Sequence, residues 1–263
     1  MTTTSPIGIF DSGVGGTTVW KEISKLLPNE QVIYLADSKN APYGDKKPEE
    51  IVRLSIKNTE FLLKNSCKTI VVACNTATTA AIATLRQKYD IPFIGIEPAI
   101  KPAASLTDTN RVGVLATKGT LSSALFHQTA NLHAKNIEIM EQRGDGLVEL
   151  IESGETNSEK TFALLKNYIE PMLEKNIDCL VLGCTHYPYL IPQLKKILPP
   201  SVTIIDSGEA VARQTKHVLE KSNLLNTSGT KPINFCYTNY KIHLLQGFIN
   251  KLELNTWVEF LEF

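Results

Sequence analysis

The chain has 263 residues, 43% of them hydrophobic, and its 27 basic side chains equal its 27 acidic ones in number. This length is enough to bury a substantial core in one large domain or two smaller ones. A formal net charge of zero gives no electrostatic attraction to polyanions, which argues against nucleic acid or an anionic membrane as a partner. The N-terminal residues lack a secretory pattern, and no apolar run reaches the length of a membrane span. We therefore predict a soluble, cytoplasmic protein.

Short runs of β-branched residues alternate with longer amphipathic segments along the first part of the chain. Strands are expected at 7–10, 31–36, 69–73 and 92–96, and helices at 17–27, 48–65 and 76–88. Such alternation predicts βαβ units that build a parallel sheet.

The same alternation then begins again. Strands are expected at 111–117, 137–141, 179–183 and 202–206, and helices at 119–132, 145–152, 157–175 and 187–197. Ile7 and Val112 start similar strands 105 residues apart, and Cys74 and Cys184 are 110 residues apart. Landmarks that keep their order at a nearly constant offset indicate an internal duplication. The predicted fold is therefore α/β, with two pseudo-symmetric, flavodoxin-like parallel-sheet domains and a cleft between them.

The last segment, 207–263, follows the second repeat. It is expected to hold a helix at 208–221, a polar loop at 223–232, a strand at 233–238 and a helix at 240–249, before a final TWVEFLE stretch. We expect this segment to pack on the first half. The predicted domains are 1–97 plus 207–263, and 98–206.

The five cysteines are odd in number and sparse for this length, which does not fit a disulfide framework. They are Cys67, Cys74, Cys179, Cys184 and Cys236. No Cys-x-x-Cys pair occurs, and the spacing of Cys179 and Cys184 places their side chains on opposite faces of a strand. Reduced thiols are expected, and no metal site.

Two of these cysteines occupy equivalent positions in the two repeats. The stretch TIVVACNTAT places Cys74 directly after a buried strand, and CLVLGCTHYP places Cys184 after another. Ligands of parallel sheets bind beyond the carboxyl ends of the strands, so the two thiols are expected to approach one ligand from opposite sides. A helix start behind each thiol favours the thiolate. Either cysteine taken alone is better explained as a core residue, but the matched pair favours chemistry.

The stretch DSGVGG at 11–16 has neither the Lys-Ser/Thr pair of a phosphate-binding loop nor the spacing of a dinucleotide-binding motif. It predicts a glycine-rich turn whose free N–H groups, with Ser12, hold a carboxylate. Asp11 would then lie beside Cys74 and orient an ammonium group or a proton-transfer partner. An ordinary helix-capping aspartate is the alternative.

Polar residues next to the other strand ends are further candidates. The loop ADSKNAPYG contains a turn that exposes Tyr43 and the backbone donor of Gly44 toward the cleft, with a plain surface turn as the alternative. Asn75 and Thr76 either cap the helix after Cys74 or donate to a substrate carboxylate.

His186 and Glu152 are more ambiguous. His186 is a structural histidine by itself but an acid–base partner when it lies next to Cys184. Glu152 ends an amphipathic helix, and its sequence position alone indicates a solvated residue.

Four motifs, DSGVGG, PYG, ACNTAT and GCTHYP, occur in this order across nearly the whole chain. Together they closely resemble the glutamate racemases, which supply D-glutamate for bacterial peptidoglycan. The resemblance implies two α/β domains with the active site between them and no cofactor. It also implies a homodimer, the frequent state of family members. The departures are Thr17 in place of a more usual Leu, and a loop that begins Ala-Asp-Ser in place of Gly-Asp-Thr.

By position in the motifs, Cys74 corresponds to the thiol that takes the proton from D-glutamate, and Cys184 to the thiol that takes it from L-glutamate. Asp11 and His186 fall where the family has the polar partners of these thiols, and Glu152 matches a further auxiliary acid. The corresponding substrate-binding positions are Asp11, Ser12, Tyr43, Gly44, Asn75, Thr76, Thr185 and His186.

Three alternatives stay open from the sequence. An aspartate racemase would share the two-cysteine design. A two-lobed protein that binds amino acids or dicarboxylates would have cysteines that merely line its cleft. A metal or redox protein is disfavoured by the cysteine spacing.

Overall fold

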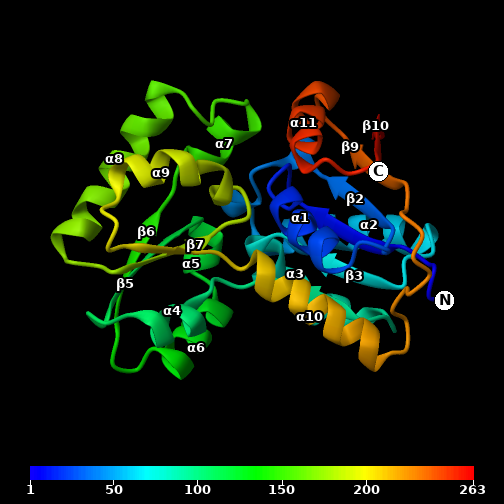
Figure 1. Ribbon diagram of the computed structural model, residues 1–263, viewed down its shortest axis with the longest axis horizontal. Coiled ribbons are helices and arrows are strands. Elements are labelled where there is room, and N and C mark those ends of the chain that lie inside the picture. Colours follow the sequence, from blue (N-terminus) through cyan, green and yellow to red (C-terminus); the bar gives the residue numbers. More distant parts are fainter.

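The computed structural model describes all residues 1–263, and it places two parallel sheets side by side, each covered by helices (Figure 1). In Figure 1 one lobe is blue and cyan with the orange and red C-terminal elements, and the other is green and yellow. The chain passes between the lobes twice, between β4 and α4 and again between β8 and α10.

The first lobe is built from two separate parts of the chain. The first part contains β1 (Ile7–Asp11), α1 (Thr17–Leu26), β2 (Val32–Ala36), α2 (Pro48–Lys64), β3 (Thr69–Val72), α3 (Asn75–Lys88) and β4 (Phe93–Gly95). The second part contains α10 (Gly208–Lys221), β9 (Asn234–Thr238), α11 (Ile242–Ile249) and β10 (Thr256–Phe260). Because β9 pairs with β2 and β10 with β9, the C-terminal strands extend the first sheet, as expected for a segment that returns to the first half.

The second lobe is built from one continuous stretch. It contains α4 (Ile100–Leu106), β5 (Arg111–Ala116), α5 (Lys118–Leu121), α6 (Ala124–His133), β6 (Glu138–Arg143), α7 (Leu147–Glu152), α8 (Glu159–Glu174), β7 (Cys179–Gly183), α9 (Ile191–Ile197) and β8 (Thr203–Ile205). All pairs in both sheets are parallel.

The two sheets repeat one topology. The strand order β2-β1-β3-β4 in the first sheet has the counterpart β6-β5-β7-β8 in the second. The register agrees as well, since Ile7 pairs with Thr69 as Val112 pairs with Cys179. These pairs reproduce the offsets of 105 and 110 residues found in the sequence. The predicted fold class of two pseudo-symmetric parallel-sheet domains is therefore confirmed.

Two local predictions need correction, and two elements were not predicted. The helix expected over 119–132 is two helices, because the Ser123 hydroxyl accepts a hydrogen bond from Phe126 N and so starts α6. The helix expected from residue 187 begins as a 3₁₀ turn over Tyr187–Leu190, and α9 then begins at Ile191 with Pro192 in its first turn. Helix α4 and strand β10 have no counterpart among the predicted elements.

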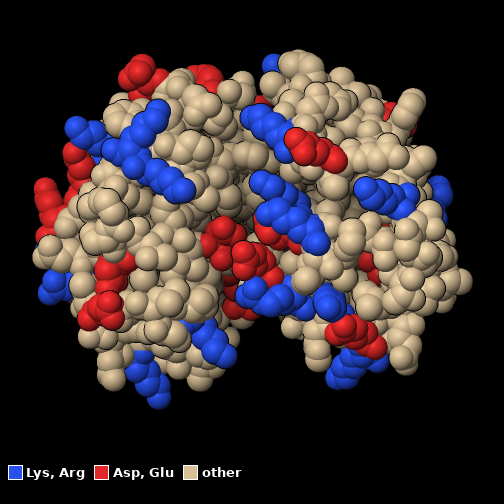
Figure 2. Space-filling model, viewed as in Figure 1, with Lys and Arg blue, Asp and Glu red and all other residues tan.

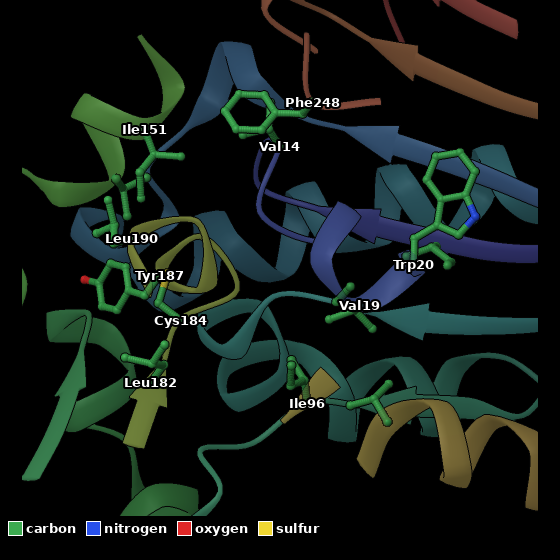
Figure 3. Packing of buried hydrophobic residues seen from close by; sticks show 14 of the residues in the cluster. Val14, Val19, Trp20, Ile96, Ile151, Leu182, Cys184, Tyr187, Leu190 and Phe248 are labelled. Carbon is green, nitrogen blue, oxygen red and sulfur yellow. The ribbon is translucent and has the colours of Figure 1, made fainter. Parts of the chain in front are cut away.

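A buried apolar cluster joins the two lobes next to the cleft. It contains Val19 and Ile96 of the first lobe and Leu182 and Tyr187 of the second, and Figure 3 shows these side chains with Cys184 at the same junction. Each sheet packs a second, separate cluster on its other face. The junction is therefore packed much like a protein core, which fixes the strand ends of one lobe against those of the other.

Basic and acidic side chains are interspersed on the surface that Figure 2 shows. None of the helices combines the length and the apolar character that crossing a membrane requires.

Candidate active site

A small cavity lies between the lobes at the carboxyl ends of β1, β3, β5 and β7. Its wall is made of Ser12, Pro42, Tyr43, Gly44, Cys74, Asn75, Thr76, Thr117, Val148, Gly183, Cys184, Thr185 and His186. Both cysteines that the sequence singled out therefore line one cavity. Of the other predicted site residues, only Asp11 and Glu152 lie behind its wall.

Cys74 is the N-cap residue of α3. Its Sγ accepts a hydrogen bond from Ala77 N (3.4 Å) and donates one to Ser12 Oγ (3.7 Å). Asn75 and Thr76 therefore do not cap the helix, and both line the cavity instead.

The setting of Cys74 corrects the expectation of a thiolate. Burial, reinforced by the nearby Asp11 carboxylate, raises the pKa of Cys74 above its ordinary value. The hydrogen bonds from Ala77 N and with Ser12 lower this pKa only in part. Helix-end effects are worth about 0.3–1 kcal/mol, less than the desolvation of a buried sulfur, so Cys74 is a thiol before a ligand binds.

Cys184 has different neighbours. Its Sγ lies 3.7 Å from His186 Nδ1, and His186 Nε2 lies 2.6 Å from Glu152 Oε1. Burial opposes a charged imidazole, but the hydrogen bonds to Cys184 and Glu152 raise the pKa of His186 well above its usual value. The imidazolium then donates from both ring nitrogens and stabilises negative charge on the sulfur. The predicted pairing of His186 with Cys184 is thus seen in the geometry.

Glu152 is not the solvated residue that its place in the sequence indicates. Its side chain is 15% exposed, and its carboxylate is the anionic end of the chain of contacts that runs through His186 to Cys184. The amphipathic pattern of its helix gives no sign of this contact, because Glu152 ends α7 and its partner lies 34 residues further along the sequence.

The glycines of the DSGVGG turn permit a close approach between the lobes. A Cβ added at Gly13 would stand 1.8 Å from Glu152 Oε1, and one at Gly15 would stand 2.3 Å from His186 Nδ1. Val14 N donates to the same Glu152 oxygen at 2.6 Å. The N–H groups of this turn do hold a carboxylate, but it belongs to the chain itself and not to a ligand.

Asp11 lies at the end of β1, fully buried behind the cavity wall. Its carboxylate accepts hydrogen bonds from Gly13 N (2.7 Å) and from Thr185 Oγ1 (2.9 Å). Burial raises the pKa of Asp11 to about 6, although the charge of His186 works in the opposite direction. Asp11 therefore orients Thr185, which does line the cavity, and adds a negative field near Cys74.

The loop between β2 and α2 supplies Tyr43 and Gly44. Tyr43 lines the cavity, and its hydroxyl is bound within the loop itself. It donates to Asp37 Oδ2 at 2.5 Å, and the residue is only 1% exposed. Asp37 thus fixes the conformation of the loop. Gly44 packs directly against the second lobe, since a Cβ added at Gly44 would lie 3.0 Å from Thr117 Cβ.

Sequence reasoning missed Thr117 and Val148, both of which line the cavity. Thr117 Oγ1 lies 2.9 Å from Thr76 Oγ1, a contact that joins the two lobes. The offset of 105 residues that relates the first strands of the two repeats leads from Ser12 to Thr117, so the duplication could have identified it. Val148 lies in α7, outside the repeated motifs, and no feature of the sequence indicates that it lines the cavity.

No group of three or more His, Cys, Asp or Glu side chains is arranged to hold a metal ion. The cavity wall instead offers two thiols, one imidazole and a set of neutral hydrogen-bond donors. Such a wall suits a small anionic ligand that exchanges protons. The expectation that no metal or cofactor takes part stays a prediction.

Comparison with known proteins agrees with this site. The family model described as Asp/Glu/Hydantoin racemase matches residues 7–215. A protein named glutamate racemase from Pseudomonas syringae pv. tomato is 50% identical over 222 residues, which cover 84% of this chain and 81% of that protein.

Solved structures extend the likeness to the whole fold. Glutamate racemase isoform RacE1 of Bacillus anthracis has a TM-score of 0.87 at 31% identity, covering 99% of this chain and 98% of that one. Glutamate racemase of Escherichia coli, solved with L-glutamate and the activator UDP-MurNAc-Ala, has a TM-score of 0.87 at 34% identity, covering 97% and 98%. The sequence match, the shared fold and the paired thiols lead to one conclusion: the chain belongs to the Asp/Glu/Hydantoin racemase family.

Proposed function

We propose that this protein interconverts L-glutamate and D-glutamate by proton transfer at the α-carbon, with two thiols and no cofactor. The observation that supports it most is that Cys74 and Cys184, at equivalent strand ends of two repeated sheets, line one small cavity. Inversion of a tetrahedral carbon requires a base on one face and an acid on the other. Two thiols that come from opposite lobes meet this requirement.

In the L-to-D direction, the Cys184 thiolate removes the α-proton while the Cys74 thiol donates a proton to the opposite face. The protonation states before binding support this assignment, because burial keeps Cys74 protonated while the His186 imidazolium faces Cys184. In the reverse direction the roles are exchanged, and Cys74 must first lose its proton. The ammonium group of the substrate offsets part of the desolvation that opposes this loss.

The carbanion formed at the α-carbon has no cofactor to take up its charge in this proposal. We assign its stabilisation to the neutral donors of the wall: the hydroxyls of Ser12, Thr76 and Thr185, the Asn75 side chain and the backbone N–H of Gly44. These groups are held in place before the substrate binds, and the narrow cavity excludes most water. Asp11 and Glu152 contribute from behind the wall, through Thr185 and His186 respectively.

The proposal also covers the domain boundaries of the protein and its location in the cell. We propose domains 1–97 plus 207–263, and 98–206, which the membership of the two sheets supports. We also propose that the protein works in the cytoplasm, where free thiols persist, and that its D-glutamate serves peptidoglycan synthesis. We expect no nucleic-acid or membrane partner.

We propose a homodimer. The exposed side chains of Trp257 (61%) and Phe260 (50%) on the edge strand β10 support it, because large apolar side chains at a surface are typical of protein interfaces. Sedimentation equilibrium would measure the assembly directly. A monomer at micromolar concentration would contradict this part of the proposal.

The function is tested by incubating the purified protein with L-glutamate or L-aspartate in deuterated water, without added cofactor and with a metal chelator present. We expect loss of optical rotation and of the α-proton signal with glutamate, and little change with aspartate. A protein that binds amino acids without reacting would leave both signals intact. Faster change with aspartate would identify an aspartate racemase instead.

A further inference from the structure

The two thiols differ in where their partners come from. The groups that contact Cys74, Ser12 Oγ and Ala77 N, belong to the same lobe as Cys74 itself. On the other side, Cys184, His186 and Glu152 all belong to the second lobe, but the chain of contacts does not end there. Both carboxylate oxygens of Glu152 also accept hydrogen bonds from the first lobe.

The first of these donors is backbone and the second is a side chain. Val14 N donates to Glu152 Oε1 at 2.6 Å, the oxygen that also contacts His186, and Ser38 Oγ donates to Glu152 Oε2 at 3.0 Å. Ser38 lies in a 3₁₀ turn just after β2, 114 residues before Glu152. The carboxylate thus depends on the first lobe for its orientation.

The turn that carries Ser38 is firmly held. The buried carboxylate of Asp37 accepts hydrogen bonds from Asn40 Nδ2 (2.8 Å), Asn239 Nδ2 (2.5 Å) and Tyr43 Oη (2.5 Å). These partners connect the residue that follows β9, the turn and the cavity wall, so the Ser38 hydroxyl has a defined position relative to the first sheet. A hydroxyl on a rigid support can orient a charged group accurately.

The geometry points to Ser38 as a positioning residue for Cys184 alone: from the opposite lobe it orients Glu152, which orients His186 against the thiol. This inference rests on the proposed function and adds a residue to it. Its consequence is an asymmetry between the thiols. The proton acceptor for L-glutamate is complete only when the lobes are closed, whereas the surroundings of Cys74 are complete within one lobe.

A substrate that requires only one of the two thiols separates these effects. With threo-β-chloroglutamate, a thiolate takes the α-proton, the electron pair of that C–H bond forms the Cα–Cβ double bond, and chloride leaves from Cβ. The enamine tautomerises to the imine and reacts with water to give 2-oxoglutarate and ammonia. No acid is needed on the other face. The L-configured isomer therefore reports on Cys184 and the D-configured isomer on Cys74.

The variants are Ser38→Ala, which removes the hydroxyl, and Ser38→Thr, which keeps it. The matched control is Ser153→Ala, because the Ser153 hydroxyl lies close in sequence to Glu152 but donates to Leu150 O. Because the Ser38 hydroxyl donates to a charged group, we expect kcat for chloride release from the L-isomer to fall roughly tenfold or more in Ser38→Ala. Release from the D-isomer should stay within about twofold.

The control and Ser38→Thr should resemble the wild-type protein with both isomers. Retained turnover of the D-isomer shows in the same assay that the Ser38→Ala protein is folded with an intact cavity. An equal loss with both isomers, or no loss with either, would overturn the role of Ser38 while leaving the proposed function in place. A wild-type protein that turns over neither isomer would overturn both.

Discussion

Cys74 and Cys184 occupy equivalent places in two repeated sheets, yet their surroundings are unlike. Cys74 caps a helix, contacts a neutral hydroxyl and a backbone N–H, and has the negative field of Asp11 nearby. Cys184 faces an imidazole that is backed by a carboxylate. The repeated framework therefore determines where each thiol lies, while side chains that differ between the two repeats determine its electrostatic surroundings.

The difference has a direct chemical meaning. Burial raises the pKa of Cys74 and so keeps its proton in place, whereas the raised pKa of His186 keeps a positive charge beside Cys184. Cys74 is thus ready to donate a proton, and the imidazolium beside Cys184 would stabilise negative charge on that sulfur. In the proposed mechanism this arrangement suits the L-to-D direction, and the reverse direction requires that Cys74 first lose its proton.

The comparison is tested most strongly by removing each thiol. Cys74→Ala and Cys184→Ala should each lower kcat for racemisation roughly 10³-fold or more in both directions, because inversion needs an acid and a base together. Elimination from β-chloroglutamate should separate them. Cys184→Ala should keep release of chloride from the D-isomer, and Cys74→Ala should keep it from the L-isomer.

A matched control is available for this test. Cys67→Ala removes a buried thiol of the first lobe that lies outside the cavity, and its kcat should remain close to that of the wild-type protein. If the Cys74 and Cys184 variants lost turnover of both isomers while circular dichroism reported a folded protein, the two thiols would not act on separate faces.

A second prediction concerns Asp11, which lies beside the Cys74 half of the site. Its folded pKa of about 6 exceeds the ordinary 3.8, so the folded state binds this proton more tightly than the unfolded state. The stability that the protonated group contributes is fully present below pH 3.8 and is lost as pH rises to about 6. A shift of this size corresponds to about 3 kcal/mol.

The measurement is the free energy of unfolding by urea at several pH values, compared between the wild-type protein and Asp11→Asn. Between pH 4 and 6 the wild-type value should fall relative to that of the variant, and above pH 6 the difference should be constant. Asp206→Asn serves as a control outside the cavity wall. A difference that does not change across this range would show that Asp11 titrates like an exposed carboxyl.

Most of the fold could be predicted because local and global signals agree. The strands are short apolar runs between amphipathic segments, and the 105-residue and 110-residue offsets are reproduced in the register of β1 with β3 and of β5 with β7. What the pattern did not reveal depends on tertiary context. Strand β10 has an exposed Trp257 and Phe260 and lacks the apolar run of a central strand, because it pairs on one side only.

The site was predicted less completely, for a physical reason. Cys74, Cys184 and His186 follow apolar strands directly, so the edge of the sheet that they share can be inferred from the sequence. Glu152 reaches the site through contacts with residues 34 and 138 positions away, and no periodicity encodes such a contact. The protonation of Cys74 depends on its burial, which a local helix-start argument does not include.

The smallest expected effect concerns Thr117, the counterpart of Ser12 in the second repeat. Its hydroxyl meets Thr76 across the cavity and touches no group that contacts either thiol, so Thr117→Val should weaken binding of glutamate and leave proton transfer largely intact. We expect the Thr117 hydroxyl to donate to a substrate carboxylate, so its loss predicts a rise in KM of roughly tenfold with kcat within about twofold. Ser12→Ala is the informative partner variant, because Ser12 contacts Cys74 and its loss should lower kcat. Steady-state kinetics in both directions distinguishes the two. Equal changes in kcat for both variants would mean that the repeats use their equivalent hydroxyls in the same way, contrary to the asymmetry seen at the thiols.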